Sequence, residues 1–233
     1  MNTSEQPPGP PPEGTPGSQP PGGSQPLDAP ASVALAVPDP AGPPSPDHAA
    51  RFEISYPSEL NRWLPLVKWL LVIPHFIVLF FVGIGAFFVA IYAFFAVLFT
   101  GQWPRGAFDF LVGTFRWTYR VAAYFHLMVD EYPPFSLADD HNYPVRLNVD
   151  YPERIDNWRP LVQWILAIPY LFIAGVLYWL TGVMTIVAFF TVLFTKQIPR
   201  GAFELMTPGF RWNVRGNAYA VFMTDRYPPF VWG

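Results

Sequence analysis

The chain has 233 residues, of which 52% are hydrophobic and 13% are charged, whereas a typical soluble domain has about 25% charged residues. This composition argues against an ordinary soluble domain, and the formal net charge of −3 provides no general attraction for nucleic acid. The chain contains no cysteine, which excludes disulfides, thiolate catalysis and cysteine-bound zinc.

Residues 1–50 differ from the rest of the chain, because they contain no Lys, Arg or large aromatic residue and are rich in Pro, Gly and Ser. Such a segment has too little apolar surface to offset the entropy that ordering costs. We therefore expect a disordered Pro/Gly-rich tail with polyproline stretches near Pro7 and Pro10. It lacks the basic start and apolar core of a signal peptide. A solvated tail is the preferred interpretation, and a ligand for a proline-binding partner is the alternative.

The first segment after the tail, residues 51–56, alternates polar or charged with apolar side chains, which is the period of a half-exposed strand. Residues 146–151 alternate in the same way, and a proline follows each segment, which ends a strand. A single strand of this length is unstable. We therefore expect the two strands to pair with each other or with the Tyr-Pro-Pro-Phe segments at residues 132–135 and 227–230.

A long apolar run comes next. Residues 66–100 contain Lys68 as their only charged residue, and residues 161–195 contain none. Asn61 and Asp156 are suitable N-caps for the helices that begin these runs. Each run is 35 residues long, which exceeds the roughly 20 residues that cross a bilayer in one helix.

We expect each apolar run to form a helical hairpin of two short membrane helices. Its turn is predicted at residues 83–85 in the first run and at residues 178–182 in the second, where glycines and interfacial aromatic residues lie. Pro74 and Pro169 should kink the first arm. The alternative is a short interfacial helix that ends at Pro74, followed by one long span over residues 75–100.

An amphipathic helix follows each apolar run. On a helical wheel its polar stripe is formed by Asp109, Gly113, Arg116 and Arg120 in the first copy and by Glu204, Arg211 and Arg215 in the second. The second helix is expected to begin at Pro208, with Thr207 as its N-cap. We expect both helices to lie in the membrane interface, because one arginine at mid-bilayer costs about 2.5–3.5 kcal/mol.

All these segments occur twice, since residues 51–135 return without a gap as residues 146–230 at an offset of 95 positions (146 − 51). The sequence therefore predicts a mainly α, integral membrane protein of two tandem repeats. Each repeat is a short strand, a Pro-kinked apolar helical hairpin and an amphipathic interfacial helix. The expected organisation is a tail at 1–50, a membrane repeat at 51–135, a linker at 136–145 and a membrane repeat at 146–233.

Equivalent loops of so regular a repeat are expected to face the same environment, so each repeat should cross the membrane an even number of times. The hairpin satisfies this condition, and so does one long span with the arginine-bearing helix as a return span. The hairpin places nearly all Lys and Arg residues on one side, which is then the cytoplasmic side. We expect a multi-pass protein of the inner membrane with a cytoplasmic N-terminus.

The order of motifs resembles the prokaryotic membrane-protein family catalogued as domain of unknown function 4389, here in tandem. The segments that carry the resemblance are Ile73-Pro74-His75, residues 99–110 (FTGQWPRGAFDF), Phe115-Arg116-Trp117 and residues 132–135 (YPPF). The second copy departs from this pattern with Tyr170, Lys196 and Pro208 at the positions of His75, Gly101 and Gly113. The resemblance implies an integral membrane protein and supplies no activity.

Arginines beside tryptophans are the strongest candidates for a binding role. At headgroup depth this combination suits anionic lipid headgroups or a membrane partner, and the alternative is that the arginines only set topology. The predicted site residues are Arg105, Arg116, Trp117, Arg120, Arg200, Arg211, Trp212 and Arg215.

Enzymatic residues are harder to find. His75 follows a proline in an apolar run and is better explained as a hydrogen-bonded structural histidine than as a proton relay. Asp109 and Glu204 are equivalent acids, and a position near helix N-termini explains them better than catalysis. The histidine spacing fits no helical metal site, and the sequence predicts no catalytic residue, metal or cofactor.

The preferred function is therefore a non-enzymatic membrane scaffold that binds anionic lipid or a protein partner, but no nucleic acid. A component of a small carrier or channel is one alternative, which the absence of charges inside the apolar runs weakens. A lipid-modifying membrane enzyme that uses Asp109 and Glu204 is the other.

The topology can be tested with single cysteines, since the chain has none of its own. With cysteine at Ser58, Gln102, Asn142 or Gln197, an impermeant thiol reagent added to intact cells should label none of the four, because all polar segments face the cytoplasm. Labelling at Gln102 and Gln197 alone would instead establish the return-span arrangement.

Overall fold

The computed structural model describes residues 48–232. Most of the predicted tail therefore lies outside the described residues. Its last residues belong to the fold, because His48 and Ala50 are buried and Ala50 begins the first strand. The folded part thus starts before Arg51.

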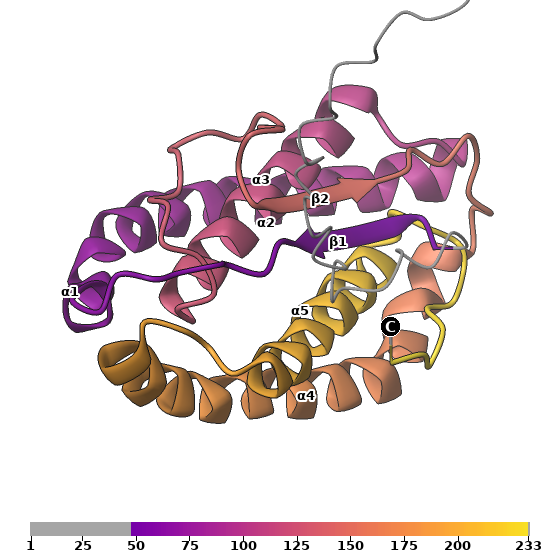
Figure 1. The fold of residues 1–233 in the computed structure, drawn as a ribbon. Helices are drawn as coiled ribbons and strands as arrows, with labels where there is room; N and C mark the ends of the chain where they lie inside the picture. The colour runs from indigo at the N-terminus through magenta and orange to yellow at the C-terminus, as the bar shows by residue number, and fades with distance from the viewer. Residues whose placement is uncertain (1–47, 233) are drawn as a thin grey trace, which may run out of the picture. The chain divides into compact units, whose positions relative to one another are not determined.

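In each repeat the described residues form one strand followed by helices (Figure 1). The elements of the first repeat are β1 (Ala50–Ile54), α1 (Leu64–Leu71), α2 (Ile73–Thr100) and α3 (Arg105–Phe125). Those of the second are β2 (Val145–Val149), α4 (Arg159–Thr195) and α5 (Arg200–Ala220). The protein is mainly helical, as the sequence predicts.

The predicted helical hairpins are wrong, because neither apolar run turns back. α2 passes through residues 83–85 and α4 passes through residues 178–182 as continuous helix. A glycine inside a helix costs only about 1 kcal/mol, whereas a turn among apolar side chains leaves backbone groups unpaired at a higher cost. The first repeat is closer to the alternative prediction, since α1 ends before Val72 and Pro74 lies at the start of α2.

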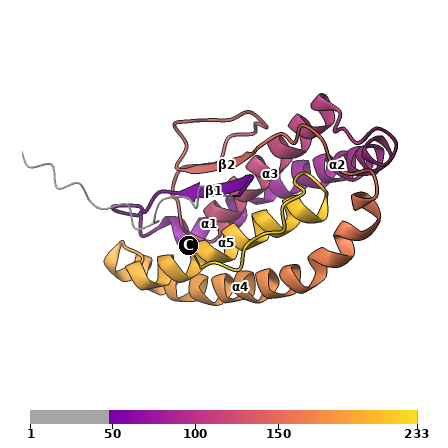
Figure 2. The same ribbon diagram turned by 90° about the vertical axis from the view of Figure 1, so that its right-hand side faces the viewer.

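Three predicted helix starts are also wrong. The N-cap residues of α1 and α4 are Trp63 and Trp158 rather than Asn61 and Asp156, although Asn61 Oδ1 accepts a hydrogen bond from Trp63 N at 3.0 Å. α5 begins at Arg200, so that Pro208 lies inside the helix and is buried. Packing of α5 along α4 stabilises the helical residues before Pro208 despite the proline. This is a tertiary effect that the local sequence does not reveal. Figure 2 shows α4 as a long arc that follows α5.

The two strands pair with each other, which was one of the two predicted pairings. They are antiparallel, and Phe52 lies opposite Leu147. These are equivalent residues of the two repeats, since 52 + 95 = 147. An antiparallel ladder has its two-fold axes perpendicular to the sheet. The repeats are therefore related by an approximate two-fold axis that passes through this central pair.

The strands are exchanged between the repeats, since β1 packs on α5 and β2 packs on α3. Matching hydrogen bonds fix the exchange on both sides. The Tyr56 hydroxyl donates to the carbonyl of Ile198 at 2.5 Å, and the Tyr151 hydroxyl donates to the carbonyl of Trp103. Because each repeat completes the other, neither has its full core alone.

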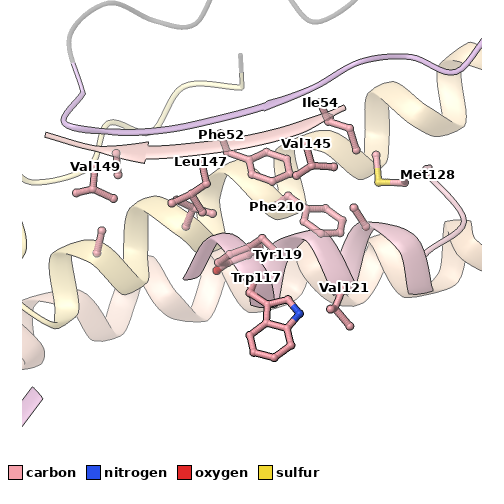
Figure 3. Packing of buried hydrophobic residues seen from close by; sticks show 14 of the residues in the cluster. Phe52, Ile54, Trp117, Tyr119, Val121, Met128, Val145, Leu147, Val149 and Phe210 are labelled. Carbon is pink, nitrogen blue, oxygen red and sulfur yellow. The ribbon is translucent and has the colours of Figure 1, made fainter. Parts of the chain in front are cut away.

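The core lies between the sheet and the two amphipathic helices (Figure 3). Phe52 stacks on Phe210 with ring centroids 5.4 Å apart, and its ring lies 6.0 Å from that of Tyr119. The opposite face of the sheet is polar and at least partly exposed. Its residues are Arg51, Glu53, Arg146 and Asn148.

The contact between α4 and α5 depends on Gly209. A Cβ atom there would lie 2.2 Å from Thr181 Oγ1 and 2.9 Å from the carbonyl oxygen of Leu177. Gly209→Ala should therefore lower the free energy of unfolding by about 1–3 kcal/mol. Gly175→Ala on α4 is the matched control, because a Cβ there meets nothing within 4 Å. Thermal unfolding in detergent, followed by circular dichroism, measures both, and equal stability of the two variants would contradict the close contact.

Candidate functional site

Arg105 and Arg200, two of the predicted binding residues, lie exposed at the starts of α3 and α5. The guanidinium carbon of Arg105 lies 3.7 Å from the ring centroid of Tyr151, and that of Arg200 lies 5.5 Å from the ring centroid of Tyr56. Each contact joins the two repeats. Such cation–π contacts are worth about 0.5–1 kcal/mol at exposed sites.

Arg116 and Arg211 each donate a hydrogen bond to an outer edge of the sheet. Ser55 N donates to the carbonyl of Pro144 and Asp150 N donates to that of Ala49, so alternation of the ladder points the Phe52 and Leu147 carbonyls away from the partner strand. Arg116 Nε donates to the Leu147 carbonyl at 2.8 Å, and Arg211 Nε donates to the Phe52 carbonyl at 3.4 Å. These arginines therefore satisfy edge carbonyls that would otherwise be unpaired.

Arg120 and Arg215 are also inside the protein, 1% and 5% exposed. Arg120 Nη1 donates to the Ala138 carbonyl at 3.0 Å, and its Nη2 lies 3.8 Å from the Asp139 carboxylate. Burial lowers the pKa of Arg120 and the Asp139 charge opposes this shift. Arg215 interacts with Tyr170 of α4. The polar stripe of the amphipathic helices is thus largely turned toward the sheet, the linker and neighbouring helices.

Trp117 and Trp212 lie in two equivalent aromatic clusters, and both are buried. Trp117 Nε1 donates to His75 Nδ1 at 3.1 Å, and the His75 ring stacks on Phe135 at 3.9 Å. This is the hydrogen-bonded structural position expected for His75. The second cluster has Tyr170 in place of the histidine, stacked on Trp212 at 4.9 Å and beside Phe230. Each cluster fastens a Tyr-Pro-Pro-Phe segment to the start of a long helix.

The structure separates the predicted residues into two groups. Arg105 and Arg200 are exposed, while the other six are buried or half-buried. Lipid or partner binding by any of them stays a prediction. The acids Asp109 and Glu204 are exposed on α3 and α5. Within residues 48–232 no three or more His, Asp or Glu side chains gather in a way that would hold a metal ion.

Two helical runs, Leu64–Thr100 and Arg159–Thr195, are long and apolar enough to cross a membrane. Comparison with known families matches residues 63–136 and 157–231 to a domain of unknown function (DUF4389). The chain belongs to the DUF4389 family. Neither a curated protein nor a solved structure matches it. The two matched segments correspond to the tandem repeats, so this DUF4389 protein contains two copies of the family domain, as the resemblance implied.

Lys68 of the first DUF4389 repeat is buried. Its structural role was not predicted from the sequence. Its ammonium group donates to the Asp130 carboxylate at 2.7 Å and to the Val129 carbonyl at 2.6 Å. In the second repeat the equivalent Gln163 donates to the carbonyl of Thr224 at 2.5 Å, and Thr224 is the equivalent of Val129 (129 + 95). The signal was present, because Lys68 is the only charge in an apolar run.

The contact with the Val129 carbonyl predicts unequal effects of two substitutions at Lys68. Lys68→Gln should be mild, because Gln163 makes the same contact in the second DUF4389 repeat. Lys68→Met should lower the free energy of unfolding by about 1–3 kcal/mol, since it leaves the Val129 carbonyl without its donor and the Asp130 carboxylate without its countercharge. Chemical unfolding in detergent compares them, and an equal loss in both variants would show that packing, not hydrogen bonding, decides.

Proposed function

We propose that this protein is a non-enzymatic integral membrane scaffold that binds anionic lipid headgroups at the membrane surface. The observation that carries the proposal is the exposure of large apolar side chains along both long helices. Phe80 and Phe81 on α2 are each 65% exposed, and Phe172 and Trp179 on α4 are 73% and 71% exposed. Water is a poor solvent for so large an apolar surface, whereas the bilayer interior suits it.

The two-fold axis supports a particular orientation. If the axis lies along the membrane normal, equivalent loops face the same side, which the gapless repeat requires. The polar outer face of the sheet then points to the aqueous side and away from the lipid. The alternative, in which the axis lies in the membrane, would place equivalent loops on opposite sides.

The length of the long helices fits this orientation. At 1.5 Å per residue, the 37 residues of α4 span about 55 Å, whereas the hydrocarbon core is about 30 Å thick. An arc that enters and leaves the membrane on one side accommodates this length. We propose such arcs for α2 and α4 in the inner membrane, with the N-terminus in the cytoplasm. Full multi-pass crossing is the alternative that the cysteine labels distinguish.

The surface arginines give the proposal its lipid specificity. Arg105 and Arg200 follow the ends of the apolar helices, where headgroups would lie in this orientation. Each such arginine is worth about 1 kcal/mol against an anionic leaflet. No side chain in the apolar runs carries a free charge for transport, because Lys68 is paired with Asp130.

Membrane attachment predicts that the chain stays with vesicles during flotation after washes at high salt and alkaline pH, because the attachment is apolar. A chain released by either wash would refute integral attachment.

Headgroup binding is tested separately with a double variant. Arg105→Gln with Arg200→Gln should lower the ratio of phosphatidylglycerol to phosphatidylcholine retained on purification, by about five-fold for each arginine. The matched control is Arg51→Gln with Arg146→Gln on the polar face of the sheet, which should leave the ratio unchanged. Mass spectrometry of the retained lipids gives the ratio, and an equal change in both double variants would refute a specific role for Arg105 and Arg200.

A further inference from the structure

Two pockets follow one seam between α1 and the C-terminal half of α4. The first, of about 580 Å³, is polar and is lined by residues 59–63 and by Lys196. The second, of about 460 Å³, is apolar, and its lining includes Pro65, Trp69, Phe125, Leu127, Gly182 and Phe190. Volumes of about 300–1,000 Å³ are usual for ligand sites.

The pockets succeed each other along the seam. At the start of α1 only Leu64 separates Trp63 of the polar pocket from Pro65 of the apolar one. On the other side, Phe190 and Lys196 are six residues apart, or about 9 Å along a helix. A single elongated ligand with one polar end therefore suits the seam better than two separate small molecules.

The lining of the apolar pocket also includes Lys68, His126 and Thr185, and each of these polar side chains is bonded to another group of the protein. Lys68 is bound to Asp130 and Val129, and its ammonium group lies 4.7 Å above the Tyr124 ring. His126 has its two ring nitrogens against the hydroxyls of Thr185 and Tyr178. Burial lowers the pKa of His126 to about 4, so the ring is neutral at pH 7. The remaining lining suits an uncharged alkyl chain.

The polar pocket presents net positive charge. Arg62 and Lys196 line it together with Glu59 as the single acid, and Trp63 beside them is 65% exposed. Lys196 has a φ of 61°, in the left-handed region, where the first repeat has Gly101 with a φ of 70°. A lysine is disfavoured in this conformation relative to glycine. Its presence at a glycine position points to a use for the charge.

Several residues of the seam differ from their equivalents across the two-fold axis. Gly182, which opens the apolar pocket, stands where the first repeat has Phe87 (182 − 95). Arg62 stands where the second repeat has Asn157, and that end of the molecule carries Arg154 in place of Glu59. The equivalent place across the axis thus differs both in the volume of the side chains and in the charges.

We propose that this seam binds one anionic phospholipid, with its headgroup between Arg62 and Lys196 and an acyl chain in the pocket beside Gly182. The site rests on the proposed membrane attachment, which brings the lipid to it. The apolar pocket is continuous with the exposed apolar surface of α1 and α4, since Trp69 and Phe190 belong to both. The occupant is therefore a lipid of the surrounding bilayer rather than a soluble anion.

The test uses the full chain in nanodiscs that contain a phosphatidylglycerol with a diazirine in its acyl chain. After illumination, peptide mass spectrometry should find the label concentrated on residues 65–69, 125–127 and 182–190. Phosphatidylcholine with the same acyl chain should label these segments about five-fold less for each favourable contact with Arg62 or Lys196 that its neutral headgroup lacks. Gly182→Phe should reduce labelling of the seam several-fold with both lipids, because it restores the side chain of Phe87.

Matched variants separate binding from folding. Gly175→Phe is also on α4 and also meets open space, but it lies outside the seam and should leave the label unchanged. Lys196→Gly should lower the ratio of labelling by phosphatidylglycerol to labelling by phosphatidylcholine about five-fold. It should not lower the thermal stability, since glycine suits the left-handed conformation.

Three outcomes would overturn the site. Even labelling along α2 and α4 that ignores Gly182→Phe would refute it while leaving membrane attachment intact. Displacement of the label by millimolar glycerol phosphate would show a site for soluble anions instead. A chain that fails to enter nanodiscs would refute the proposed attachment and this site together, which gel filtration shows before illumination.

Discussion

The pairing of β1 with β2 is the constraint on which the rest of the fold depends. Neither five-residue strand would be stable alone, and each lies on the helix of the other repeat. The ladder therefore fixes the relative position of all four long helices. Its central pair, Phe52 and Leu147, also sets the two-fold axis that relates the repeats.

The exchange explains why arginines lie inside so apolar a protein. A sheet of two strands has two unpaired edges, and an edge against protein has no water to satisfy its carbonyls. Arg116 and Arg211 donate to these edge carbonyls from the helices beneath. Replacing them with apolar residues would leave buried acceptors unpaired. Their place in both repeats is thus a folding requirement, and any lipid contact comes in addition to it.

Periodicity was sufficient to predict the strands, the apolar runs and the amphipathic helices, because these depend on nearby residues. The central pair of the strand ladder joins residues 95 positions apart (147 − 52), so the sequence left the strand pairing open between two alternatives. The hairpins could not be judged in this way. The glycines at residues 83–85 and 178–182 favour a turn locally, but continuous backbone hydrogen bonding among apolar side chains outweighs them. The contacts of the arginines were equally hidden. Arg116 and Leu147 are 31 positions apart, and Arg211 and Phe52 are 159 apart.

Comparison of the repeats separates folding requirements from additional features. Some differences preserve a contact, as when Gln163 replaces Lys68 and still donates to the equivalent carbonyl. Tyr170 likewise keeps the aromatic cluster of His75. Gly182 and Lys196 do not follow this rule, since one removes the volume of Phe87 and the other places a charge in a conformation that favours glycine. These two differences, which neither contact explains, both lie at the proposed lipid seam, where the repeats depart from two-fold symmetry.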